Sequence, residues 1–143
     1  MDRFLIMKLD ELVENFEFLG DWEERYRYII DLGRKLNVMP EEAKIDENLV
    51  QGCTSRVWLT IQVSDEKPIK IKFLADSDAY IVKGLIGIAL MLYSDRTPEE
   101  IIELEIDDIF TKLGLDEHLS PNRRNGFQSM ITKMKAVARE HLT

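Results

Sequence analysis

The hydrophobic periodicity of the chain predicts an α+β fold in which helices flank a small antiparallel sheet. Apolar residues recur at helical spacing through the first third and the last half of the sequence, and they alternate with polar residues in the middle. The connections between the alternating runs are too short for parallel crossovers, so the strands must pair antiparallel. No internal repeat or low-complexity linker divides the 143 residues. We therefore expect one domain over residues 1–143.

Two helices are expected before the sheet. Residues 2–18 carry apolar side chains at helical spacing, and Gly20 follows as a stop signal. Asp21 then fits an N-cap, with Glu24 three residues later completing a capping box, so a second helix begins there. The periodicity fades over residues 37–50, which we expect to form a connecting segment.

Three strands are expected in the middle of the chain. Residues 57–63 (VWLTIQV) alternate with the period of a half-buried strand. Residues 69–74 (IKIKFL) alternate again after the turn SDEKP. The short run that ends at Val50 fits a third strand, with the loop that holds Cys53 between it and the next strand. The sequence thus predicts a small three-stranded antiparallel sheet.

Local signals mark the helices of the last half. Asp76 or Ser77 can cap a helix that is apolar nearly all round and therefore central. Thr97 fits an N-cap, because proline and glutamate follow it at the first and third helical positions. A short helix ends at Gly114, and Ser120 opens the final helix. The expected helices cover residues 78–94, 98 onward, 108–113 and 121 onward.

Two glycines interrupt the central helix. Gly84 and Gly87 each cost about 1 kcal/mol relative to alanine in a helix interior. Close approach of a neighbouring segment explains such a cost, and we expect that segment to be a strand rather than a ligand.

Composition excludes several classes of function. A formal net charge of −8 argues against nucleic-acid binding, which needs a basic face, and against docking on anionic membranes. The longest apolar stretch, residues 85–93, is too short to cross a bilayer, and the first residues do not form a secretory signal. With a single cysteine as well, we expect a cytoplasmic protein.

The single cysteine, Cys53, is the principal candidate for chemistry. It follows Gly52 and precedes Thr54 and Ser55, so it lies on a tight polar loop rather than on an apolar face. A reactive thiol needs nearby positive charge or aligned N–H donors, whereas an inert thiol packs as a small hydrophobe. Both alternatives stay open from the residues alone.

Two arginines lie where the helix dipole disfavours positive charge. Arg123 and Arg124 occupy the first turn of the final helix. An exposed pair would cost only a few tenths of a kcal/mol, roughly, and would need no function. The alternative is a positive site that faces an anion, a thiolate or an acidic partner, and we favour it for one of the two.

Other candidate groups give weaker signals. Asp76 and Asp78 could act as a carboxylate pair, but capping of the following helix explains them and is favoured. With His118 and His141, Cys53 makes three residues of the types that hold structural zinc, which needs four. A catalytic Cys53–His118 pair is formally possible, although the sequence offers His118 no orienting partner.

Four segments carry motifs in a specific order and spacing: NLVQGCTSRVWL (48–59), DSDAYIVKGLIGIALMLYS (76–94), TPEEI (97–101) and LGLDEHLSPNRRNGF (113–127). Together with the helical opening, which includes DWEERYRYIIDLG, they resemble the SufE family, the sulfur-acceptor proteins that work with cysteine desulfurases in iron–sulfur cluster assembly. The resemblance covers nearly the whole chain.

The resemblance implies a fold of the SufE/IscU type and identifies Cys53 as the acceptor cysteine. The scaffold branch of this fold holds a cluster with additional cysteines, which this chain lacks. Asp78, Lys83 and Arg123 fall in shared motifs, and we take them as candidate supporting or docking residues.

The implied function is sulfur transfer. A cysteine desulfurase of the SufS or CsdA type, which carries its own pyridoxal phosphate, would pass persulfide sulfur to Cys53. The chain, needing no cofactor, would hold it as a cysteine persulfide, deliver it to iron–sulfur scaffold proteins and stimulate the desulfurase. Nucleic acid and membranes are not expected partners. The alternatives are a thiol peroxidase or redox sensor that uses Cys53, a pure activator of the desulfurase, and a cluster scaffold.

Overall fold

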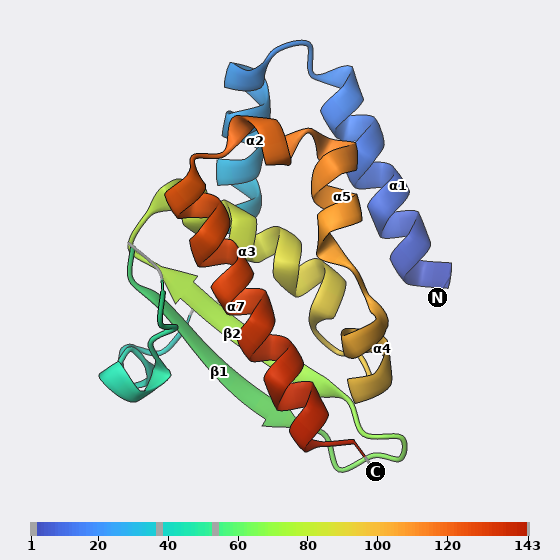
Figure 1. The fold of residues 1–143 in the computed structure, drawn as a ribbon, viewed down its shortest axis with the longest axis vertical. Helices are drawn as coiled ribbons and strands as arrows, with labels where there is room; N and C mark the ends of the chain where they lie inside the picture. Colours follow the sequence, from blue (N-terminus) through green and yellow to red (C-terminus); the bar gives the residue numbers. More distant parts are fainter. Residues whose placement is uncertain (1–2, 37–38, 53–54, 143) are drawn as a thin grey trace.

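The computed structural model describes residues 3–36, 39–52 and 55–142, with side-chain environments from residue 9 onward (Figure 1). Cys53 lies outside the described residues. The expected α+β class, with a small antiparallel sheet packed against helices, is confirmed. The elements are α1 (Arg3–Phe18), α2 (Trp22–Arg34), the 3-10 turns η1 (Glu41–Ala43) and η2 (Asp46–Asn48), β1 (Val57–Val63), β2 (Ile71–Ser77), α3 (Tyr80–Tyr93), α4 (Pro98–Glu103), α5 (Ile106–Leu113), α6 (Leu115–His118) and α7 (Pro121–Glu140).

The sheet of the described residues has two strands, not the expected three. β1 and β2 pair antiparallel over their full lengths, from Val57 opposite Ser77 to Val63 opposite Ile71. The segment that ends at Val50 forms only an isolated bridge beside β1, with the Val50 N–H donating to the Val57 carbonyl at 2.8 Å. A 3-10 turn precedes this bridge and Gly52, with φ of +89°, follows it, so the backbone leaves the sheet on both sides.

β2 runs through the residues that were expected to cap the next helix. It ends at Ser77, and α3 begins only at Tyr80, after an N-cap residue, Ala79, without a side-chain cap. The Ser77 hydroxyl instead donates to the Arg56 carbonyl at 2.7 Å and accepts from the Ala79 N–H at 3.2 Å. The capping prediction for Asp76 and Ser77 is therefore wrong, because pairing with β1 extends the strand.

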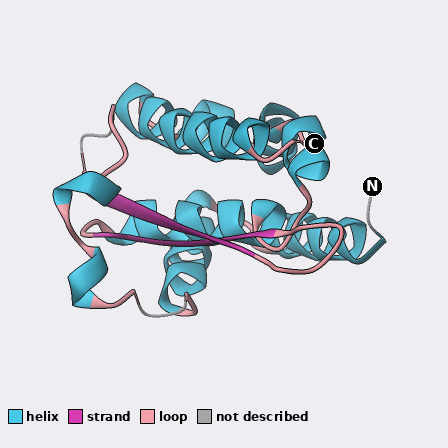
Figure 2. Cartoon of the chain, turned by 90° about the horizontal axis from the view of Figure 1, so that it is seen from below, coloured by secondary structure: helices cyan, strands magenta, loops and turns pink. Residues whose placement is uncertain are grey.

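The helix α3 is central, as expected, and α2 and α7 both pack on it. Figure 2 shows the two strands nearly edge-on, with helices on both sides of them. An ideal Cβ on Gly84 would lie 2.1 Å from the Ile29 carbonyl oxygen of α2. The segment that approaches the glycines is therefore α2, and the expectation of a strand there is wrong. Within the described part of the chain, no helix combines the length and apolar character needed to span a membrane.

Most other helix boundaries follow their local signals, but α5 begins at Ile106, two residues before the expected start, and α6 was not expected. The Asp21 side chain accepts from the Glu24 N–H, Thr97 begins a complete capping box, and Ser120 caps α7. Gly114 ends α5 in the left-handed region, with φ of 73°. The expected inward stripe of α7 is buried; it consists of Phe127, Met130, Ile131, Met134 and Ala138.

Candidate functional site

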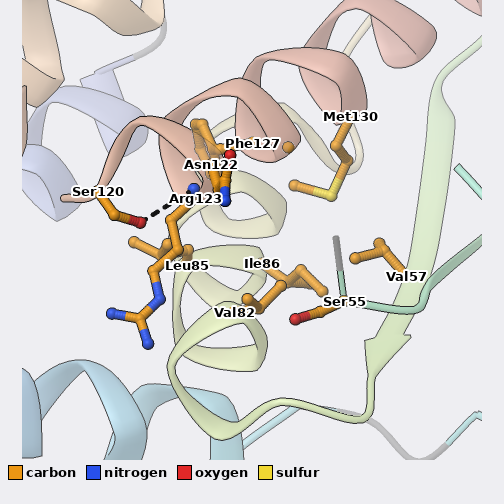
Figure 3. Close-up of a pocket in the computed structure, with 11 residues that line it drawn as sticks. Ser55, Val57, Val82, Leu85, Ile86, Ser120, Asn122, Arg123, Phe127 and Met130 are labelled. Atoms are coloured by element: carbon orange, nitrogen blue, oxygen red, sulfur yellow. Dashed lines mark hydrogen bonds between the residues drawn. The ribbon is translucent and has the colours of Figure 1, made fainter. Parts of the chain in front are cut away.

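A cavity of about 410 Å³ opens between α3, the first residues of β1 and the start of α7 (Figure 3). Six of its eleven described lining residues have apolar side chains, and its polar groups come from the approach to β1 and from the start of α7. The lining residues are Ser55, Val57, Val82, Leu85, Ile86, Ser120, Asn122, Arg123, Gly126, Phe127 and Met130. From the sequence alone, the apolar lining residues would be assigned to the packed core. Helical periodicity cannot distinguish a residue in a cavity wall from one in a packed interior.

Both described flanks of the cysteine loop contact this part of the fold. Ser55 lies in the cavity wall, two residues after Cys53 in the sequence. On the other flank, Gly52 packs so closely on α7 that an ideal Cβ would lie 2.6 Å from the Ser129 hydroxyl oxygen. The loop therefore leaves and rejoins the described structure beside α7 and the cavity.

Asp78 links the start of α3 to the residue that follows this loop. One Asp78 carboxylate oxygen accepts the Arg56 N–H at 3.1 Å, and the Asp78 N–H donates to the Arg56 carbonyl at 3.4 Å. Asp78 is exposed at the surface. The geometry supports a positioning contact rather than acid–base chemistry with Asp76.

Lys83 belongs to a charge cluster centred on Asp76. The Lys83 ammonium lies 3.3 Å from one Asp76 oxygen, and the Lys44 ammonium lies 3.1 Å from the other. Lys44 also pairs with Glu41 at 3.0 Å and lies over the Trp58 ring, 5.8 Å from its centroid. Asp76 thus ties the segment before β1 to α3. Lys44 was not predicted, since nothing in the local sequence relates it to Asp76.

The environment of Asp76 favours the charged carboxylate. Asp76 is 7% exposed, and this burial alone would raise its pKa. The hydrogen bond from the Ser77 N–H at 2.8 Å and the ammonium groups of Lys44 and Lys83 outweigh burial, so the pKa of Asp76 lies below its ordinary value. The pKa of Lys44 is raised by its bonds to Glu41 and Asp76.

The two arginines of α7 have different surroundings. Arg123 lines the cavity, and among the described residues no carboxylate forms an ion pair with it. Arg124 lies outside the cavity lining and donates to the Asp116 carbonyl. Of the two arginines, Arg123 is therefore the one that lines a cavity, and its functional role stays a prediction.

Neither histidine lines the cavity. The His118 ring stacks on Trp22 with centroids 3.8 Å apart, and the Tyr26 hydroxyl donates to the His118 carbonyl at 2.5 Å. The His141 Nδ1 contacts the Val137 carbonyl at 2.9 Å. The structure thus places His118 against α2 and gives no support to a catalytic pair with the cysteine.

Comparison with known proteins gives one consistent family. The family profile described as "SufE: Fe-S metabolism associated domain" matches residues 10–138. An uncharacterized SufE-like protein of Rhizobium meliloti (strain 1021) is 46% identical over 135 residues, covering 94% of this chain and 96% of that protein. An uncharacterized SufE-like protein of Rhizobium etli is 44% identical over 140 residues, covering 96% and 94%.

The fold is shared with a solved structure of low sequence identity. The solution structure of a hypothetical protein from Thermus thermophilus superposes with a TM-score of 0.72 at 21% identity. The superposition covers 93% of this chain and 94% of that one. The overall fold thus recurs in a distant sequence.

Proposed function

The chain belongs to the SufE family, and from this premise we propose that it is a sulfur acceptor for a cysteine desulfurase, with Cys53 as the acceptor. The sulfur then passes to iron–sulfur scaffold proteins, and removal of sulfur from the desulfurase stimulates its turnover. Among the described residues, the observation that supports this function best is the apolar cavity that reaches Ser55, beside the cysteine loop.

The transfer is an exchange between two sulfur atoms. The donor carries a persulfide, R–S–SH, and the Cys53 thiolate attacks its terminal sulfur. The new S–S bond forms on Cys53 as the old one breaks, and the donor leaves as a thiolate. No external oxidant or reductant is needed. With no second cysteine in the chain, the persulfide on Cys53 cannot be resolved into an intramolecular disulfide.

The cavity provides a suitable environment for the bound sulfur. For a persulfide that enters the cavity, Leu85, Ile86 and Phe127 would form apolar walls that limit its contact with water and solutes. Arg123 places one positive charge in the lining, at the end away from Ser55, from where its field favours anionic groups inside the cavity. We assign Arg123 this supporting role.

The surface beside the loop is the proposed docking site for the desulfurase. A desulfurase that reaches Cys53 must also cover Arg56 and Asp78. Both residues are exposed, and a hydrogen bond joins them. Tyr80 follows on the first turn of α3 and is 75% exposed. Aromatic residues are enriched among the side chains that dominate binding energy. Lys83, in the next turn, supports this surface through Asp76.

The test is transfer of labelled sulfur. The chain is incubated with a cysteine desulfurase and sulfur-labelled cysteine, and protein-bound label is measured for the wild type and for Cys53→Ser. We expect label on the wild type, release of that label by dithiothreitol, and no label on the variant. Label that remains on Cys53→Ser would refute the assignment.

Two controls distinguish the alternatives. Cys53→Ser should lose stimulation of the desulfurase, whereas a pure activator would keep it. Peroxide added in the absence of the desulfurase should oxidise Cys53 only slowly, whereas a thiol peroxidase would form sulfenic acid on it rapidly. Release by dithiothreitol distinguishes a persulfide from a sulfinic acid. A mass measurement alone would not, because one added sulfur and two added oxygens raise the protein mass by nearly the same amount.

A further inference from the structure

The cavity is larger than one bound sulfur atom requires. Its volume of about 410 Å³ falls in the range of pockets that hold small organic ligands, roughly 300–1,000 Å³. Its walls come from three separate elements, α3, β1 and α7, so it is a feature of the assembled fold (Figure 3). Its size therefore suffices for a small organic molecule.

The polar groups of the cavity favour an anionic ligand. None of the described lining residues is acidic, although the chain carries a formal net charge of −8. Arg123 lines the cavity without a carboxylate partner among the described ion pairs, and Asn122 and Ser120 lie beside it. A guanidinium can bind a carboxylate through two parallel N–H···O bonds.

Three cations outside the cavity lining have partners of their own. Lys44 and Lys83 share the Asp76 carboxylate, and Arg124 donates to the Asp116 carbonyl. In Figure 3 the Arg123 guanidinium lies at the opposite end of the displayed group from Ser55 and Val57. A ligand whose carboxylate binds Arg123 would therefore extend its other end along the apolar wall toward the cysteine loop.

We propose that this cavity binds a small carboxylate-bearing thiol, with the carboxylate on Arg123, and that this thiol accepts sulfur from Cys53. The inference rests on the proposed function and deepens it, because it adds a small-molecule acceptor to the protein acceptors. The thiol arm lies along Leu85 and Ile86, and its sulfur points toward the Ser55 end of the cavity.

The proposed reaction is balanced without another reactant. The thiolate of the ligand attacks the terminal sulfur of the Cys53 persulfide, and a new S–S bond forms on the ligand. The S–S bond to Cys53 breaks, and the cysteine leaves as a thiolate, which takes up a proton. The products are the free protein and a small carboxylate-bearing persulfide.

The first experiment measures transfer. Chain loaded with labelled sulfur is mixed with mercaptopropionate or with its uncharged amide, and label release is followed over a range of thiol concentrations. For the wild type we expect saturation with the carboxylate and a linear dependence with the amide. We compare the rate of label release with the carboxylate to the rate with the amide. In Arg123→Gln this ratio should fall about tenfold, because loss of a hydrogen bond to a charged group has an effect of that size.

Arg124→Gln is the matched control. It removes the same charge from the next residue, which lies outside the cavity lining, so the rate ratio should equal that of the wild type. Equal ratios in the wild type and Arg123→Gln, or equal falls in both variants, would overturn the proposal.

The second experiment measures binding without sulfur chemistry. The S-methylated form of mercaptopropionate is titrated into ¹⁵N-labelled Cys53→Ser protein, and we expect saturable shifts of the Arg123, Phe127 and Ser55 amides. Absence of such shifts would overturn the binding site. If the wild type failed to load sulfur, the proposed function would be refuted instead. The titration does not depend on sulfur loading, so it would still show whether the cavity binds the ligand.

Discussion

The contact between α2 and α3 allows a quantitative test of how the central helix is held. An alanine Cβ at Gly84 would lie 2.1 Å from the Ile29 carbonyl oxygen and 2.5 Å from its Cγ2. Real Cβ contacts essentially never fall under 3.0 Å. Because the nearest atom belongs to the backbone of a helix, α2 and α3 must separate by roughly an ångström to accept one methyl group.

The expected cost follows from two opposing terms. Overpacking a well-filled core costs about 1–3 kcal/mol, and a rigid backbone obstacle calls for the upper end of that range. Alanine is favoured over glycine by about 1 kcal/mol in a helix interior. Gly84→Ala should therefore lower the free energy of unfolding by about 2 kcal/mol.

Gly87→Ala in the same helix is the matched control. Its ideal Cβ lies 3.3 Å from the Leu32 carbonyl oxygen, which needs a shift of only a few tenths of an ångström. This variant should range from neutral to about 1 kcal/mol more stable than the wild type. The assay is urea unfolding followed by circular dichroism. We expect the slope of the unfolding free energy against urea concentration to stay unchanged and the midpoint urea concentration to shift. If the Gly84→Ala variant proved at least as stable as the Gly87→Ala variant, the packing argument would be refuted.

Two further predictions concern the surroundings of the cysteine loop. Asp76→Asn should destabilise the fold by about 2–3 kcal/mol at neutral pH, since it removes the shared partner of Lys44 and Lys83 from a site that is only partly open to solvent. Because the pKa of Asp76 is lowered in the fold, its contribution is present above the ordinary value of 3.8 and is lost as pH falls through the depressed folded value. The difference between variant and wild type should thus shrink below pH 3.8, and a difference that stays constant in urea titrations down to strongly acidic pH would contradict this. Tyr80→Ala should weaken the affinity for the desulfurase about tenfold, with little change in the maximal transfer rate. The control is Phe18→Ala, which removes an aromatic ring that is 88% exposed at the end of α1 and should leave the affinity unchanged. Equal affinities for the two variants in transfer kinetics would rule out the proposed docking surface.

Much of the fold is predictable because its signals are local. The capping box at Thr97, the cap at Ser120 and the left-handed Gly114 each act within one turn of helix, and all three have the expected role. The inward stripe of α7 is equally local, since a helix of period 3.6 presents one face to whatever covers it.

The errors arise where distant segments compete with local preferences. Asp76 and Ser77 have the composition of a helix cap, yet pairing with β1 keeps both in the strand. The third strand is reduced to a bridge because the backbone turns away before and after Val50. The segment facing Gly84 was expected to be a strand because a glycine reports close approach without identifying the neighbour.

By itself the sequence determined the fold class and most helix boundaries, because these depend on residues close together along the chain, and it offered Cys53 as the candidate for chemistry. Only the tertiary structure decided which arginine lines a cavity, which lysines share Asp76 and how closely two helices approach. The physical reason is that a cavity or an ion pair forms between segments that meet only after folding, and no local pattern encodes their relative position.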